Sequence, residues 1–157
     1  MNQRFLTPSK ITAFLDCEHF LTLQHRLEAG QVEARATFGS MAQMLMAKGL
    51  THERACLEYY RNLGLSVYEV PNKEKHEGFS DWVRRVGNPM ADRHDVIYQM
   101  PFANDGIRGV ADFLLRMEGA DGTAHYEPVD AKLTREEAKP GHVLQLCFYA
   151  DAIEALN

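Results

Sequence analysis

The sequence predicts an α/β domain in which helices flank an antiparallel meander of three strands, or a mixed sheet if a further strand is present. Apolar side chains at helical spacing mark three predicted helices: 7–30, 38–62 and 141–156. Between the last two lie three segments typical of strands: 96–102, 107–116 and 125–133. The turn signals 104–106 and 119–122, each containing Asp and Gly, separate these segments and favour antiparallel pairing between neighbours.

Each predicted helix has its own sequence signals. The first begins with Thr7 as a cap and Pro8 in the first turn, and it ends at Gly30. The second stops at Gly64, and its expected core residues are Met41, Met44, Leu45 and Leu57. The last helix is expected to close the core with Val143, Leu144, Leu146, Cys147, Phe148 and Ile153. Residues 65–70 indicate a further short strand, and a polar loop, 72–80, leads from it to a helical turn around Trp82.

Composition sets the outer limits. A chain of 157 residues with 45% hydrophobic and 25% charged residues is expected to form one globular domain. No apolar run approaches the roughly 18 residues of a membrane span, and the N-terminus lacks the apolar core of a signal peptide, so we expect a cytoplasmic protein. Cys17, Cys56 and Cys147 are dispersed, which indicates neither a disulfide framework nor a zinc site of paired cysteines.

The formal charge of −5 counts against a protein that coats nucleic acid through its overall charge. Carboxylates of a metal site would contribute part of that charge, and bound cations would reverse it locally. Six basic residues could line a restricted basic track. For most of them the favoured interpretation is a solvated surface position. The candidates for that track are Arg84, Arg85, Arg93, Lys132, Arg135 and Lys139.

Two aspartates on predicted neighbouring strands indicate a metal site. Asp112 lies inside the apolar run 110–115, where an ionised carboxylate is costly unless a cation or hydrogen bonds compensate it. Asp130 and Lys132 are two residues apart, so a regular strand places both on one side. Two such aspartates would form a hard-oxygen pocket suited to Mg²⁺ or Mn²⁺. The alternatives are a surface aspartate on an edge strand and a surface ion pair of little energetic value.

These segments resemble the RecB-type nucleases of the PD-(D/E)XK superfamily. Four motifs match in family order: Gly49-Leu50-Thr51-His52-Glu53, Gly109-x-x-Asp112, Asp130-x-Lys132 and Gln145-x-x-x-Tyr149. The likeness runs from about residue 7 to the end of the chain, and it extends to bacterial proteins of the RecB nuclease family through the segments 96–99, 111–114 and 145–149. Each motif alone is weak, but four in order are hard to obtain by chance.

The resemblance implies a restriction-endonuclease-like core and metal-dependent hydrolysis of phosphodiester bonds, with DNA as the expected substrate and Mg²⁺ or Mn²⁺ as the cofactor. The implied metal ligands are His52, Asp112, Asp130 and a backbone carbonyl near Ala131. Lys132 is expected to act with the two aspartates in catalysis, by orienting or deprotonating the attacking water. Gln145 and Tyr149 share one helix face and are expected to contact substrate or support the lysine, and the alternative is a core tyrosine with a hydrogen-bonded hydroxyl.

Two neighbouring acidic residues are ranked lower. Glu53 follows His52 on a helix, and adjacent helical side chains diverge, so only one of the pair is expected to touch the metal. Glu127 points away from Asp130 on a regular strand, although Pro128 could mark a bulge that re-aims it.

The resemblance also bears on domain organisation. The implied core normally has one further strand, which we expect to be absent, supplied differently or located beyond the end of the chain. Residues 1–157 are therefore expected to be a single domain, either the N-terminal part of a longer protein or a naturally short homologue, with further domains or a helicase as partners in DNA repair. Some relatives carry an iron–sulfur cluster on four cysteines, and three dispersed cysteines predict none here.

Two other functions are compatible with the sequence. The first is a nuclease-like module that has lost activity and guides nucleic acid to a neighbouring domain. The second is a structural or regulatory domain in which the same residues form an ion-pair network without metal. The sequence leaves open DNA or RNA, single or double strands, cleavage at ends or internally, and the oligomeric state.

Overall fold

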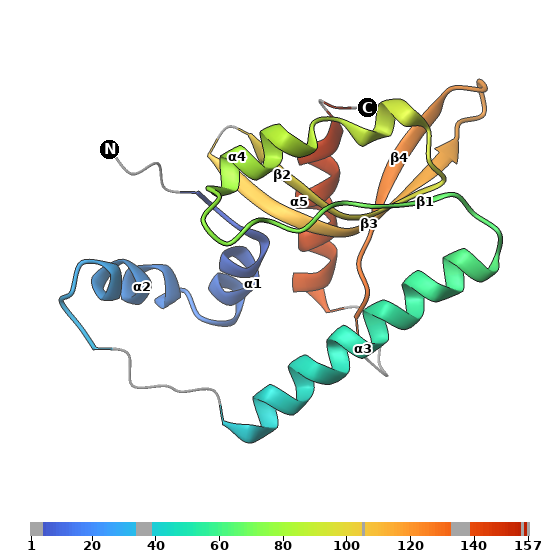
Figure 1. The fold of residues 1–157 in the computed structure, drawn as a ribbon. Coiled ribbons are helices and arrows are strands. Elements are labelled where there is room, and N and C mark those ends of the chain that lie inside the picture. Colours follow the sequence, from blue (N-terminus) through green and yellow to red (C-terminus); the bar gives the residue numbers. More distant parts are fainter. Residues whose placement is uncertain (1–4, 34–38, 105, 133–138, 155, 157) are drawn as a thin grey trace.

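A mixed four-stranded sheet forms the centre of the protein in this computed structural model, which describes residues 5–33, 39–104, 106–132, 139–154 and 156 (Figure 1). The strands lie in the order β1-β2-β3-β4. Their bounds are β1 (Val67–Glu69), β2 (Val96–Asn104), β3 (Ile107–Glu118) and β4 (Ala124–Val129). The predicted antiparallel meander is present as β2, β3 and β4, but the sheet is not three-stranded, because β1 adds a parallel fourth strand beside β2.

The parallel pairing of β1 with β2 follows from the segment that joins them. Parallel neighbours need a crossover connection, and here it contains α4 (Phe79–Val86), which packs against β2. The Trp82 indole donates a hydrogen bond of 2.8 Å to the carbonyl of Pro71, and Arg85 pairs with Glu77. These two contacts hold α4 against the loop that precedes it. The helical turn predicted around Trp82 is α4. The crossover that contains α4 brings β1 beside β2, at the edge of the sheet.

The predicted single helix over 7–30 is wrong. Two helices are present, α1 (Pro8–Asp16) and α2 (Phe20–Glu28), and Cys17 between them has an extended backbone. Asp and Cys are weak helix formers, and the break lets α1 pack on the last helix while α2 buries no residue. The predicted start is confirmed, because the Thr7 side chain accepts a hydrogen bond from the N–H of Lys10 at 3.3 Å.

The second predicted helix is α3 (Ser40–Asn62), while the predicted first residue, Phe38, lies outside the described residues. Leu57 is buried against Val96 and Phe113, as expected of a core residue. The burial predicted for three other residues is wrong, because they are exposed: Met41, Met44 and Leu45. The reason is that only the C-terminal half of α3 reaches the sheet, while its N-terminal half extends away from it (Figure 1).

The last helix, α5 (Pro140–Glu154), lies against the sheet and beside α1 (Figure 1). Ile153 is buried, and Leu146 and Phe148 pack against the larger core cluster, as predicted. The predicted burial of three other residues is wrong, because they are exposed: Val143, Leu144 and Cys147. Apolar residues occur on most sides of this helix, so its periodicity could not select the buried face. Within the described ranges, no helix is long and apolar enough to cross a membrane.

Candidate functional site

The site begins where β4 leaves the sheet. The last pair of the β3–β4 ladder is Phe113 with Val129. One step further, the Asp112 Oδ2 accepts a hydrogen bond of 3.1 Å from the N–H of Ala131, so a side chain takes the position of a ladder partner. The predicted strand 125–133 is thus too long: Asp130 and Lys132 follow β4 instead of lying in it, and residue 133 is outside the described residues.

Asp112 carries the clearest electrostatic signal of the site. Burial raises the pKa of its carboxyl group to about 7. The N–H of Ala131 opposes this rise, while the negative charges of Asp130 and Glu53 add to it. Without a metal, Asp112 therefore ionises only around neutral pH, and a cation nearby would favour its ionised form.

Asp130 and Lys132 form an ion pair, with 2.9 Å between Oδ2 and Nζ. The Asp130 side chain is only 3% exposed, whereas that of Lys132 is 36% exposed and can reach a ligand. Apart from this ion pair, the same Oδ2 receives no hydrogen bond from the described residues. A buried carboxylate oxygen in this state is a suitable ligand for a cation.

The two predicted residues of α5 join this pair. The Gln145 side-chain amide donates to Asp130 Oδ1 at 3.3 Å and to the Tyr149 hydroxyl at 2.9 Å. Tyr149 is buried, and its burial raises the pKa of its phenol to about 12. The structure thus connects Asp130, Lys132, Gln145 and Tyr149 in one network.

On α3, Glu53 and His52 have different contacts. Glu53 Oε1 accepts a hydrogen bond of 2.7 Å from the Tyr98 hydroxyl and another from the Gln99 amide. Glu53, Gln99 and Asp112 line one cleft of about 820 Å³, and His52 is not among its lining residues. The ring of His52 instead lies 3.9 Å from the sulfur of Cys56, one turn along the helix. Of the two residues that the sequence motif marked, Glu53 is the one that lines the cleft beside Asp112.

Gln99 was missed by sequence reasoning. Its φ of +61° lies in the left-handed region, which costs energy for a residue with a side chain. As a consequence Tyr98 and Gln99, which are neighbours on β2, both reach Glu53, although a regular strand would direct them to opposite faces. No local signal marks this position, because glutamine is not a residue typical of left-handed backbone.

The described candidates for the basic track lie on separate elements, with Arg93 directly after the 3₁₀ turn Pro89–Asp92. Arg84 and Arg85 lie on α4 and pair with Asp81 at 3.0 Å and Glu77 at 2.8 Å. Arg135 lies outside the described residues. Lys132 and Lys139, in contrast, line the same cleft. Glu127 is exposed and contacts His125 at 3.1 Å.

The residues fit a magnesium or manganese ion only as a site of few protein ligands. In the described part of the chain, no group of three or more His, Cys, Asp or Glu side chains is placed to hold a metal. Mg²⁺, however, keeps several waters and is commonly bound by one or two carboxylates together with substrate phosphates. Asp112 and Asp130 meet that requirement. Ala131 contributes its N–H to Asp112, which is a different atom from the carbonyl that the sequence suggested.

No family model, curated protein or solved structure matches the chain. The chain folds into an α/β domain that brings Asp112 of β3 beside Asp130 and Lys132, which follow β4, while a glutamate and a glutamine approach from two different helices.

Proposed function

We propose that the protein is a divalent-metal-dependent nuclease of the RecB type that hydrolyses phosphodiester bonds in DNA. The observation that carries the proposal is the meeting of Asp112, Asp130 and Lys132 where β4 ends. Both carboxylates are hard-oxygen donors, and the adjacent ammonium is exposed enough to meet a phosphate. The order of the four sequence motifs supports the same class.

Each residue has a role that its position allows. Asp112 and Asp130 would hold Mg²⁺ or Mn²⁺, and Glu53, which lines the same cleft as Asp112, would add negative charge beside them. When bound, the ion activates a water and neutralises charge on the phosphate. Lys132 orients that water and stabilises the negative charge that develops on the phosphoryl oxygens. Gln145 keeps Asp130 in orientation and is itself held by Tyr149. Water oxygen bonds to phosphorus, the bridging P–O bond breaks, and the leaving oxygen is protonated.

The test is cleavage of end-labelled DNA, single-stranded and duplex, with Mg²⁺ or Mn²⁺. The wild-type protein should cleave, EDTA should stop the reaction, and Asp112→Ala should be inactive. Lys75→Ala is the matched control, because Lys75 lies in an exposed loop and lines neither cleft. Cleavage that persists in EDTA or in Asp112→Ala would count against the proposal.

A nuclease-like binding module is the second candidate. It is favoured by the ion pair that already engages Lys132 with Asp130, and by the small number of metal ligands among the described residues. Such a module should retain labelled DNA on a filter in EDTA and leave it intact with Mn²⁺. The same samples therefore distinguish the two candidates.

A further inference from the structure

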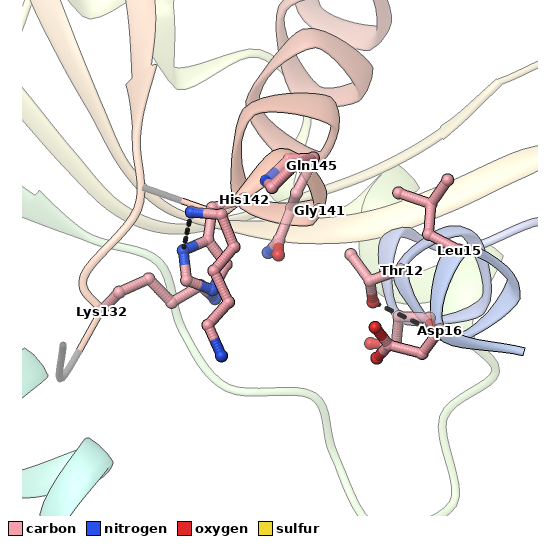
Figure 2. A pocket seen from close by; sticks show the side chains of 10 residues that line it. Thr12, Leu15, Asp16, Lys132, Gly141, His142 and Gln145 are labelled. Carbon is pink, nitrogen blue, oxygen red and sulfur yellow. Dashed lines mark hydrogen bonds between the residues drawn. The ribbon is translucent and has the colours of Figure 1, made fainter. Parts of the chain in front are cut away.

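A second cleft, of about 790 Å³, lies between α1 and the start of α5 (Figure 2). It shares Lys132 and Gln145 with the candidate site. Figure 2 shows Lys132 and His142 on one side of it and Thr12 and Asp16 on the other. A volume in this range is typical of sites for small ligands, which span about 300–1,000 Å³.

The two walls of the cleft differ in chemistry. The wall beside the candidate site carries basic side chains: Lys132, Lys139 and His142. The α1 wall carries two hydroxyls, an apolar side chain and a carboxylate: Ser9, Thr12, Leu15 and Asp16. A ligand that satisfies both walls has an anionic group at one end, and at the other an apolar face with hydrogen-bond donors. A nucleotide has this combination.

The imidazole of His142 is held as a donor toward the cleft. The N–H of Lys139 donates to His142 Nδ1 at 3.4 Å, so Nδ1 is an acceptor and the neutral ring carries its proton on Nε2. A donor N–H beside two ammonium groups is suited to phosphate oxygens. The opposite wall is held close, because a Cβ on Gly141 would lie 3.3 Å from the Thr12 methyl group.

We propose that this cleft binds the terminal nucleotide of a polynucleotide, a placement that rests on the proposed nuclease function. Its phosphate lies against Lys139 and His142, its nucleoside lies against Leu15 and Asp16, and Lys132 faces the bond to be cleaved. Asp16 can accept hydrogen bonds from base N–H or sugar hydroxyl groups, and its charge repels a further phosphate. A strand therefore ends in the cleft, and cleavage proceeds from strand ends.

The test measures the binding of thymidine monophosphate to the full chain by calorimetry in EDTA. Thymidine and inorganic phosphate are the comparison ligands. Thymidine monophosphate should bind at least about tenfold more tightly than either comparison ligand, because only it contacts both walls. Lys139→Ala and His142→Ala should each weaken that binding about fivefold or more, and Lys75→Ala should not. Thr12→Trp should abolish it by filling the cleft.

Equal affinity for phosphate and thymidine monophosphate would overturn the nucleotide assignment, and unchanged binding in both Lys139→Ala and Thr12→Trp would place the ligand elsewhere. Circular dichroism identifies any variant that fails to fold, and Lys139→Ala alters only an exposed side chain. Because binding is measured without metal, its outcome is separate from cleavage. Cleavage without nucleotide binding rejects the cleft alone, and nucleotide binding without cleavage rejects the nuclease alone.

The preference for strand ends is tested by comparing the degradation rates of linear and circular substrates. A linear single strand should be degraded at least about tenfold faster than a circular single strand of the same sequence, and Asp16→Ala should reduce that ratio. Equal rates on both substrates would overturn the terminal placement.

Discussion

Gln99 on β2 and Asp112 on β3 stand opposite each other at a break in the sheet ladder. Tyr98 pairs with Phe113 on one side of the break and Met100 pairs with Ala111 on the other. The left-handed backbone of Gln99 interrupts the alternation of side chains, and both Gln99 and Asp112 line the cleft that contains Glu53. The candidate metal carboxylate thus lies opposite a local departure from regular strand geometry.

The break predicts an unusual response to substitution at position 99. Gln99→Val should lower the free energy of unfolding by about 1–3 kcal/mol, because a β-branched residue is strongly disfavoured at positive φ. Gln99→Gly should cost less than Gln99→Val, since glycine adopts this backbone freely and loses only the hydrogen bond to Glu53. Urea unfolding of both variants measures the difference, and a Gly variant less stable than the Val variant would contradict it.

Asp112 predicts a pH dependence of stability in the metal-free protein. Its pKa of about 7 exceeds the unfolded value of about 4, so between these pH values the folded state binds more protons than the unfolded state. Its contribution therefore falls as pH rises from about 4 to about 7. Asp112→Asn should raise the free energy of unfolding at pH 7.5 by on the order of 1–3 kcal/mol and remove this slope.

The pH range of that experiment is chosen to avoid the titration of Glu77. Arg85 lowers the pKa of Glu77 to about 2, and such a group contributes in the opposite sense, losing stability only as pH falls below about 4.5. Urea unfolding of the wild type and of Asp112→Asn between pH 5 and 7.5 in EDTA therefore isolates Asp112, because the difference between the two proteins removes the contributions of the seven histidines and other shared groups. A difference that does not grow with pH across this window would be evidence against the assignment.

Glu53 and His52 give opposite predictions for metal binding. Glu53→Gln should weaken Mn²⁺ binding by about 10-fold or more, because it removes a charge beside Asp112 and alters the hydrogen bonds from Tyr98 and Gln99. His52→Ala should change it less than about threefold. Calorimetric titration of both variants decides between them. The reverse order of effects would restore His52 as the ligand that the sequence motif implies.

Substitution of Lys132 should reduce catalysis and leave metal binding largely intact. Lys132→Ala should reduce kcat on labelled DNA by about 100-fold or more while Mn²⁺ affinity stays within a few-fold of wild type, since its interaction acts mainly in the transition state. Lys132→Arg should restore only part of the rate, because the planar guanidinium occupies a different position and keeps its proton. Near-wild-type cleavage by Lys132→Ala would exclude the proposed role.

Local patterns in the chain were enough to predict the elements that surround the site. Helical spacing predicted α3 and α5, and turn signals between β-rich segments predicted the meander of β2, β3 and β4. The four-residue separation of Gln145 and Tyr149 predicted one helix face, and the hydrogen bond between them confirms it. These properties follow from backbone periodicity, which involves residues only a few positions apart.

Contacts between distant segments decided the rest. The crossover through α4 placed β1 parallel to β2, and the packing of α1 on α5 left the helix over 7–30 broken at Cys17. Met41 and Leu57 both fit the helical spacing, yet Met41 is exposed and Leu57 is buried, because only one end of α3 reaches the sheet. The packing of α3 and the left-handed Gln99 placed Glu53 in one cleft with Asp112. Periodicity specifies which residues share a face, whereas the orientation of that face depends on partners far away in the chain.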